Sequence, residues 1–321
     1  MAVGVIGAAV SLWMLKEATY GEAASGNYHQ LGLMTGALAP RQELLDVPVL
    51  GLGTGRNPTD PMLGEVTLED TINVPVTTDG FGHWLRLLMG APTSTGSGSA
   101  FTHVFSSGAA ALPSNTLVLD YGPRLGSNRY MRGLGVRAAS AALEFSNAGP
   151  ARADIALVGQ GGEYVSSPGT GTPALSHGAV FNRAAGVIKL GETSLGKVTS
   201  SSLNLSNGIQ SLRTIRNDRK IEEAEEGLFT GTGSVTLRFA EGGLLPASLA
   251  GTPVDLSIGF EVSETRSLMF RMERAFLSRP GPRIEGPQGV DVTYEFRASG
   301  EGLAAAVVAT LKNGVAGTAY A

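Results

Sequence analysis

The chain of 321 residues contains no cysteine. This absence excludes disulfide frameworks, cysteine-ligated zinc sites and thiol nucleophiles, and it leaves the redox compartment open. Aromatic residues are also scarce, at 6% of the sequence. An outer-membrane barrel needs aromatic girdles at both lipid interfaces, so the composition argues against that class of protein.

An excess of basic residues is missing too. Lys and Arg number 24 against 28 Asp and Glu, which gives a formal net charge of −4. Proteins that grip nucleic acid through its phosphates need a basic face. The charge balance therefore argues against nucleic-acid binding as the main function, although DNA could still slide past such a surface.

No apolar run is long enough to cross a bilayer. The apolar stretch 1–15 falls short of the roughly 20 residues that a spanning helix needs. Its first basic residue is Lys16, so it also lacks the basic start of a signal peptide. We expect residues 10–17 to form a strand in a protein that is made in the cytoplasm and has no membrane association.

Glycine is abundant, with 45 residues beside 16 prolines and no three-residue period. This excludes collagen and indicates many short strands joined by turns. Apolar and polar residues alternate in four stretches, which is typical of antiparallel sheets with one packed face. The predicted fold class is mainly β, with packed antiparallel sheets, and the four stretches are 66–74, 117–121, 256–262 and 290–297.

Few segments favour a helix. The best is 80–89, where Thr78 or Asp79 can cap the first N–H groups, and Gly90 and Pro92 follow the last turn. A weaker candidate is 241–250. The stretch 303–311 fits either a third helix or another strand.

A small-residue segment near the middle, 166–173 (SSPGTGTP), predicts a linker. With residues 166–176 as linker, the two flanking domains, 1–165 and 177–321, share an element order: strand, strand, long loop, strand, helix, three strands. Glu17–Gly21 (EATYG) matches Glu192–Gly196 (ETSLG), and Leu87–Pro92 matches Ser248–Pro253. We therefore predict an internal duplication.

Two glycine motifs imitate nucleotide sites. Gly191–Lys197 (GETSLGK) has the spacing of a phosphate-binding loop, but Val198 stands where that loop needs Ser or Thr, and a strand-like pattern follows. Gly51–Gly55 lacks the third glycine of a dinucleotide fingerprint at the required position, and nearby prolines forbid the helix that should follow. The four histidines have no partner at metal-ligand spacing. We predict no catalytic, cofactor-binding or metal-ligating residues; a nucleotide-binding enzyme and a carbohydrate-binding β-sandwich are the alternatives.

A run of charges in the second half predicts either a solvated loop or a contact between subunits. The contact candidates in this run are Arg213, Arg216, Asp218, Arg219, Lys220, Glu222, Glu223, Glu225 and Glu226.

An ordered set of segments resembles the tail tube proteins of long-tailed, non-contractile bacteriophages (siphophages). Glu17–Gly21 is similar to their E-x-T-x-G opening, and 64–93 to their strand, helix and terminal glycine. Phe101–Phe105 is similar to the strand after their small-residue loop. Beyond the linker, three further segments look similar, and they are 202–207, 231–235 and 290–299.

The resemblance implies two tandem tail-tube-like domains, each with a flanking helix, whose inner strands join into a β-barrel lumen in the ring. It implies a structural virion protein of the phage tail, made in the host cytoplasm, that self-assembles into stacked rings through which DNA is ejected. Its partners would be itself, other tail proteins, and viral DNA that passes without specific binding. We expect a trimeric ring with pseudo-sixfold symmetry, with a true hexamer as the alternative.

The resemblance also places the long loop of each half, 46–63 and 213–226, toward the neighbouring ring. Arg56 and Asp60 in the first of these loops therefore join the contact candidates. A tail terminator or baseplate hub protein is the alternative within the structural class.

Overall fold

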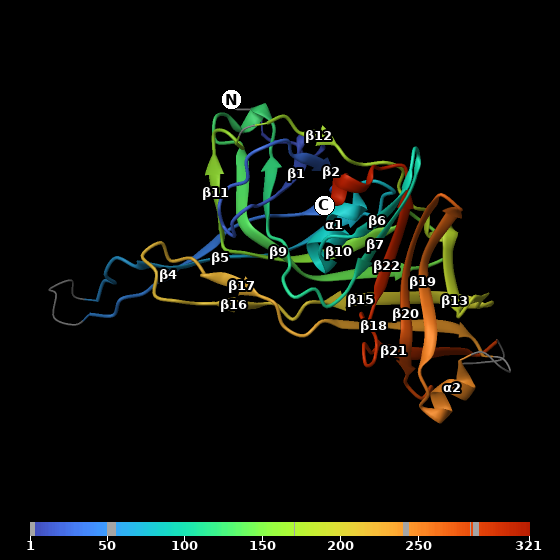
Figure 1. The fold of residues 1–321 in the computed structure, drawn as a ribbon. Coiled ribbons are helices and arrows are strands. Elements are labelled where there is room, and N and C mark those ends of the chain that lie inside the picture. The colour runs from blue at the N-terminus through green and yellow to red at the C-terminus, as the bar shows by residue number, and fades with distance from the viewer. Residues whose placement is uncertain (1–3, 50–55, 170, 240–243, 283, 285–288) are drawn as a thin grey trace.

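A computed structural model of the chain describes residues 4–49, 56–169, 171–239, 244–282, 284 and 289–321 (Figure 1). The predicted motif 51–55 lies outside the described residues. The strands up to residue 165 are β1 (Ser11–Lys16), β2 (His29–Leu31), β3 (Thr35–Gly36), β4 (Arg41–Leu45), β5 (Met62–Pro75), β6 (Thr93–Ser97), β7 (Ala100–Ser106), β8 (Asn115–Asp120), β9 (Tyr130–Phe145), β10 (Arg152–Gly159) and β11 (Gly161–Val165).

The later strands are β12 (Ala174–Leu175), β13 (Gly186–Leu190), β14 (Thr193–Ser194), β15 (Val198–Ser206), β16 (Gln210–Leu212), β17 (Glu223–Glu225), β18 (Thr230–Arg238), β19 (Val254–Ser263), β20 (Arg266–Leu277), β21 (Asp291–Ala298) and β22 (Val308–Asn313). The helices are α1 (Phe81–Met89) and α2 (Leu245–Ala250), with short 3-10 turns at Gly7–Ala9, Pro123–Leu125, Arg183–Ala185 and Gly317–Tyr320.

The mainly β prediction is confirmed, and β21 follows its predicted alternation. Val292, Tyr294 and Phe296 are buried, whereas the residues between them face solvent. The single packed face expected for 117–121 is wrong, because every residue of β8 is buried. Leu117 lies in the main core, while Val118 on the opposite face packs in a second cluster of large aromatic side chains.

Helix α1 is confirmed, but its predicted cap is wrong. Gly80 is the N-cap residue and makes no side-chain cap. The hydroxyl of Thr78 instead accepts a hydrogen bond from the Ala179 N–H at 3.1 Å. Helix α2 is shorter than expected and ends at Gly251, whose φ of 66° is left-handed. The stretch 303–311, left open between helix and strand, leads into strand β22.

No helix in the described part of the chain combines the length and the apolar character that crossing a membrane requires.

Strand pairing follows the same order twice. In the first half the neighbours run β1–β8–β9–β10–β5–β3. In the second half they run β13–β19–β20–β21–β18–β15. After β10, β11 returns to pair with the start of β9, and after β21, β22 returns to pair with the start of β20. The helix of each half lies between corresponding strands in the chain.

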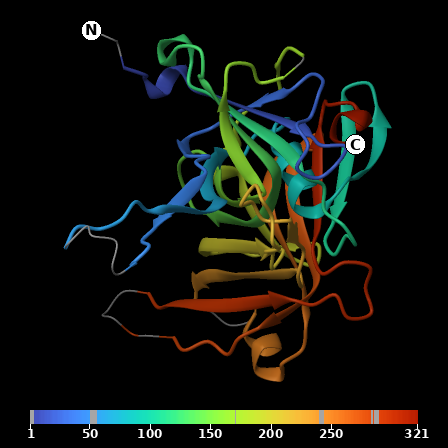
Figure 2. The ribbon, with the colours of Figure 1, turned by 90° about the vertical axis from the view of Figure 1, so that its left-hand side faces the viewer.

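Hydrogen-bonded strands join the two halves. β9 pairs with β15, and β7 pairs with β22. Figure 2 shows the yellow-to-red strands below the blue and green ones, with red β22 reaching upward beside them. The core crosses the same boundary, because the ring of Phe260 stacks on Phe145 and Phe181 at centroid distances of 4.9 and 5.6 Å. The segment 166–176 lies along the first half, where β12 pairs with β2.

Candidate functional site: two charged arms

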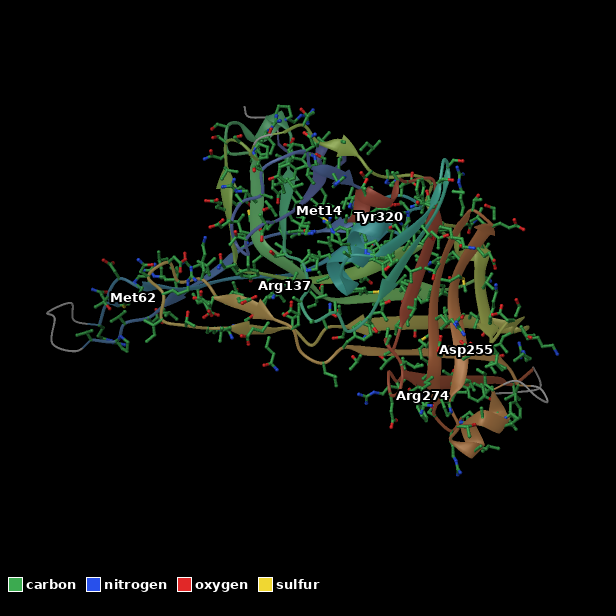
Figure 3. All side chains as sticks on the ribbon, viewed as in Figure 1. Met14, Met62, Arg137, Asp255, Arg274 and Tyr320 are labelled. Carbon is green, nitrogen blue, oxygen red and sulfur yellow. The ribbon has the colours of Figure 1, made fainter. Side chains whose placement is uncertain are left out.

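Two extended hairpins project from the same side of the body, at the left of Figure 1. The first arm, residues 41–49 and 56–66, consists of β4, the described residues that follow it and the start of β5. The second arm, residues 210–226, contains the two-stranded sheet of β16 and β17. In Figure 3, Met62 lies out along the first arm and Arg137 lies near the base of both. The charge run predicted as a contact is therefore the second arm.

The two arms bind each other within one chain. The Val66 N–H donates to the Arg219 carbonyl at 2.8 Å. The Arg213 guanidinium Nε contacts both carboxylate oxygens of Glu65, at 3.1 and 2.8 Å. Both partners of this ion pair are substantially exposed, so it contributes at most about 1 kcal/mol to stability. It orients the arms more than it stabilises the fold.

Arg216 organises the tip of the second arm. Its guanidinium contacts Asp218 at 2.9 and 2.7 Å and Glu222 at 2.8 Å. Hydrogen bonding to these carboxylates raises the pKa of Arg216, and the same guanidinium lowers the pKa of Asp218. Lys220 closes the turn, since its N–H donates to Asp218 at 3.2 Å. These four predicted contact residues thus form a cluster within the arm.

Glu223 and Glu226 lie at the base of the second arm, against the body. Both pair with Arg137 of β9, at 3.0 and 3.2 Å. Arg137 is only 6% exposed, and it also donates to the Ala224 carbonyl and lies over the Tyr20 ring. Burial raises the pKa of Tyr20 to about 12, so its hydroxyl stays protonated while accepting a bond from the Ala224 N–H. These two glutamates therefore anchor the arm to its own chain.

Four of the predicted contact residues are exposed and form no ion pair within the described part of the chain. They are Arg56, Asp60, Arg219 and Glu225. The first two lie on the first arm and the others on the second. Their charged groups are available to a neighbouring molecule.

The sequence reasoning missed the exposed apolar side chains on both arms. Met62 is 60% exposed on the first arm, and Ile215 is fully exposed on the second. A group of exposed large apolar residues on projecting hairpins marks a surface that is buried against another protein. Long turn regions are read as polar loops in sequence, so these residues gave little signal. The other exposed large apolar residues on the arms are Leu44, Leu45, Val49, Leu63 and Leu212.

The motif Glu17–Gly21 has a structural explanation. The Glu17 carboxylate is 5% exposed and accepts four hydrogen bonds. The Gly21 and Gly135 N–H groups donate at 3.0 and 2.9 Å. Two hydroxyls complete the set, from Ser114 at 2.6 Å and Thr116 at 3.0 Å. The buried carboxylate therefore ties the end of β1 to β8 and β9.

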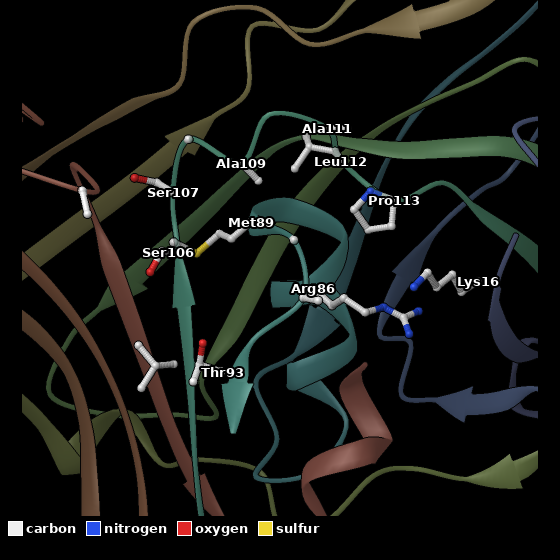
Figure 4. Close-up of a pocket in the computed structure, with 15 residues that line it drawn as sticks. Lys16, Arg86, Met89, Thr93, Ser106, Ser107, Ala109, Ala111, Leu112 and Pro113 are labelled. Atoms are coloured by element: carbon white, nitrogen blue, oxygen red, sulfur yellow. The ribbon is translucent and has the colours of Figure 1, made fainter. Parts of the chain in front are cut away.

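A cavity of about 570 Å³ lies beside α1 (Figure 4). Arg86 of α1 and Lys16 of β1 line one end of it, and small, hydroxyl and apolar side chains line the rest. The lining includes no carboxylate and no histidine. No group of three or more potential metal ligands occurs among the described residues.

The phosphate-loop spacing at 191–197 forms a turn between strands. Residues 193–194 are β14, and Lys197 precedes β15 rather than a helix. Lys197 has a left-handed φ of 61°, a conformation that suits glycine. We expect Lys197→Ala to leave stability and assembly nearly unchanged, and Lys197→Gly to raise the unfolding free energy by about 1 kcal/mol. Thermal unfolding measures both, and nucleotide hydrolysis abolished by Lys197→Ala would contradict this interpretation.

Acid is expected to destabilise the fold through His83. Its ring is 2% exposed and lies 4.0 Å from the His29 ring. Burial lowers the pKa of His83 to about 2, with smaller contributions from His29 and Arg86. The unfolded chain takes up this proton near pH 6.5, so stability is full above that pH and falls as the pH drops toward 2. Between pH 7 and pH 5 we expect a loss of about 2 kcal/mol from this group.

Chemical denaturation across this pH range measures the loss. His83→Gln should reduce the pH dependence without abolishing it, because burial also lowers the pKa of His29 and of His103. Replacement of the partly exposed His177 by Asn is the control. An equal slope in wild type and His83→Gln would show that other groups cause the acid sensitivity.

A family model described as phage tail tube protein matches residues 7–298, which include both arms and nearly the whole sheet. No curated protein matches the sequence significantly. The match confirms the resemblance to phage tail tube proteins that was drawn from Glu17–Gly21 and the segments after it. The chain therefore belongs to the phage tail tube protein family and is a structural component of the phage tail.

Proposed function

We propose that this protein self-assembles into rings that stack into the hollow tail tube of a siphophage, through which DNA is ejected. The observation that carries the proposal is the pair of arms, which project from the body with exposed apolar side chains and unpaired charges. Contacts with the neighbouring ring would bury these groups. The role is mechanical rather than enzymatic.

We propose further that three chains form a ring with pseudo-sixfold symmetry. The repeated strand order supports two tail-tube-like domains, residues 1–165 and 177–321, that would occupy two of six positions. Covalent linkage keeps the two domains of one chain at high effective concentration, so half of the domain contacts around the ring form within a chain. The alternative is a hexamer of chains, in which the second half would be an outer domain.

DNA passage without specific binding fits the charge of the chain. With a net charge of −4, the chain has no excess of cations to hold phosphates by counterion release. A neutral or acidic lumen would let the genome move through rapidly.

Cryo-electron microscopy of tubes assembled from the purified protein tests the proposal. Three chains per ring, with two superimposable domains in each, are required; six chains per ring would exclude the trimer. A variant tests the arms directly. Ile215→Asp should leave the monomer folded, because this side chain is fully exposed, yet prevent tube formation.

Leu125→Asp is the matched control, since Leu125 is also exposed but lies in a turn of the body away from both arms. Tubes should form normally with that variant. Normal tubes from Ile215→Asp would show that the second arm does not take part in stacking.

A further inference from the structure

The cavity beside α1 has the size and the mixed lining of a small-molecule site. Its volume of about 570 Å³ falls within the roughly 300–1,000 Å³ that ligand pockets occupy in proteins. Such pockets are mostly apolar, with a few polar groups that fix the orientation of the ligand. Lys16 and Arg86 supply two positive charges, and none of the lining residues carries a negative charge. The charged group of a ligand that fits this cavity is therefore an anion.

Arg86 is a buried cation with few partners. The residue is only 3% exposed, and burial lowers the pKa of its guanidinium. Of its five N–H donors, two make long bonds, to the main-chain oxygen of Ala321 at 3.4 Å and to the Asn115 side chain at 3.3 Å. Its Nε has no partner among the described residues. A buried charge without a counterion is destabilising, so an anion that reaches Arg86 would stabilise the fold.

Lys16 brings a second cation to the same place. It is the last residue of β1 and lies directly opposite Asn115 of β8, the residue that accepts a bond from Arg86. In Figure 4 its amino group points toward the Arg86 guanidinium at one end of the cavity. Neither side chain forms an ion pair within the described part of the chain. Two cations that face each other repel, and one anion between them would attract both.

The rest of the lining suits a hydrocarbon body. Met89 and Leu112 are buried apolar residues that line the cavity away from the cations. The buried hydroxyl of Ser107 is already engaged, because it accepts bonds from the Ala306 and Val307 N–H groups, both at 3.0 Å. A small inorganic anion would fill only the cationic end, whereas a ligand with an apolar body would also cover the apolar lining.

We propose that this cavity binds a small organic acid. The carboxylate lies between Arg86 and Lys16, where both side chains donate charge-assisted hydrogen bonds to its oxygens. The hydrocarbon body lies against Met89 and Leu112. The cavity holds the ligand and performs no reaction on it. All of its lining comes from one chain, so the inference does not depend on the proposed ring.

Isothermal titration calorimetry of the purified protein with straight-chain monocarboxylates tests the site. Each methylene that moves from water into an apolar lining increases the affinity about fourfold. Hexanoate has two more methylenes than butyrate and should therefore bind roughly tenfold more tightly. Inorganic phosphate at matched ionic strength is the comparison anion, and it should bind more weakly than hexanoate because it has no apolar body.

Variants of the two cations test the carboxylate end. Lys16 is exposed, so Lys16→Met should stay folded and bind hexanoate about fivefold more weakly. Arg86→Met should abolish measurable binding, and its melting temperature shows whether it is folded. If it is not, Arg86→Lys keeps the charge without the planar fork and should still weaken binding at least about tenfold. Arg266→Met is the matched control, because Arg266 is exposed and does not line the cavity.

The outcomes distinguish an organic acid from an anion of any kind. Tighter binding of the longer acid, weakened by Lys16→Met and unchanged by Arg266→Met, supports the site. Phosphate that binds as tightly as hexanoate overturns the assigned class of ligand. Hexanoate binding that Lys16→Met leaves at the wild-type level overturns the place of the carboxylate. Neither heat nor a change in melting temperature with any acid at millimolar concentration overturns the proposal as a whole.

Discussion

Replacement of Glu17 by Ala is expected to lower the free energy of unfolding by about 3–5 kcal/mol. The carboxylate is buried and accepts bonds from two backbone N–H groups and two hydroxyls. Its removal leaves these donors buried without their acceptor, and water does not fully replace the lost hydrogen bonds. Each buried donor without a partner costs about 1–3 kcal/mol. The end of β1 would separate from β8 and β9.

Glu192 is the matched control, since it occupies the corresponding place in the repeated motif but is exposed. Glu192→Ala should change the unfolding free energy by less than about 0.5 kcal/mol. Chemical denaturation of the monomer measures both variants. Equal stability of Glu17→Ala and wild type would mean that the hydrogen bonds of Glu17 contribute nothing to the fold.

Replacement of Arg137 by Met should cost a similar amount, about 3–5 kcal/mol, and should also release the second arm. Its guanidinium joins β9 of the first half to Glu223, Glu226 and the Ala224 carbonyl of the arm. Met fills part of the volume but leaves the carboxylates without their cation. Hydrogen exchange should therefore rise across residues 210–226 more than in β9.

Arg152→Met is the control for a lost charge. The Arg152 side chain is 50% exposed and its contact with Glu144 is 3.9 Å long, so its loss should cost less than about 1 kcal/mol. Unchanged hydrogen exchange in the arm of Arg137→Met would show that the β16–β17 hairpin holds its position without this network.

Patterns between neighbouring residues determined much of the fold. The alternation in β21 and the apolar helix α1 follow from side-chain periodicity, which a sequence displays directly. The failed phosphate loop at 191–197 was also readable, because Val198 and the strand after it exclude the required helix. These features depend on residues close together in the chain.

Contacts between distant segments decided the rest. Burial of both faces of β8 depends on clusters drawn from β1, β2 and β9, and no local pattern reveals those partners. The division of the charge run has the same origin. Glu223 anchors the arm because Arg137, far away in sequence, lies beneath it, whereas Glu225 two residues later faces solvent. Sequence supplies the charges, but only tertiary packing determines which of them are already paired and which remain for another chain.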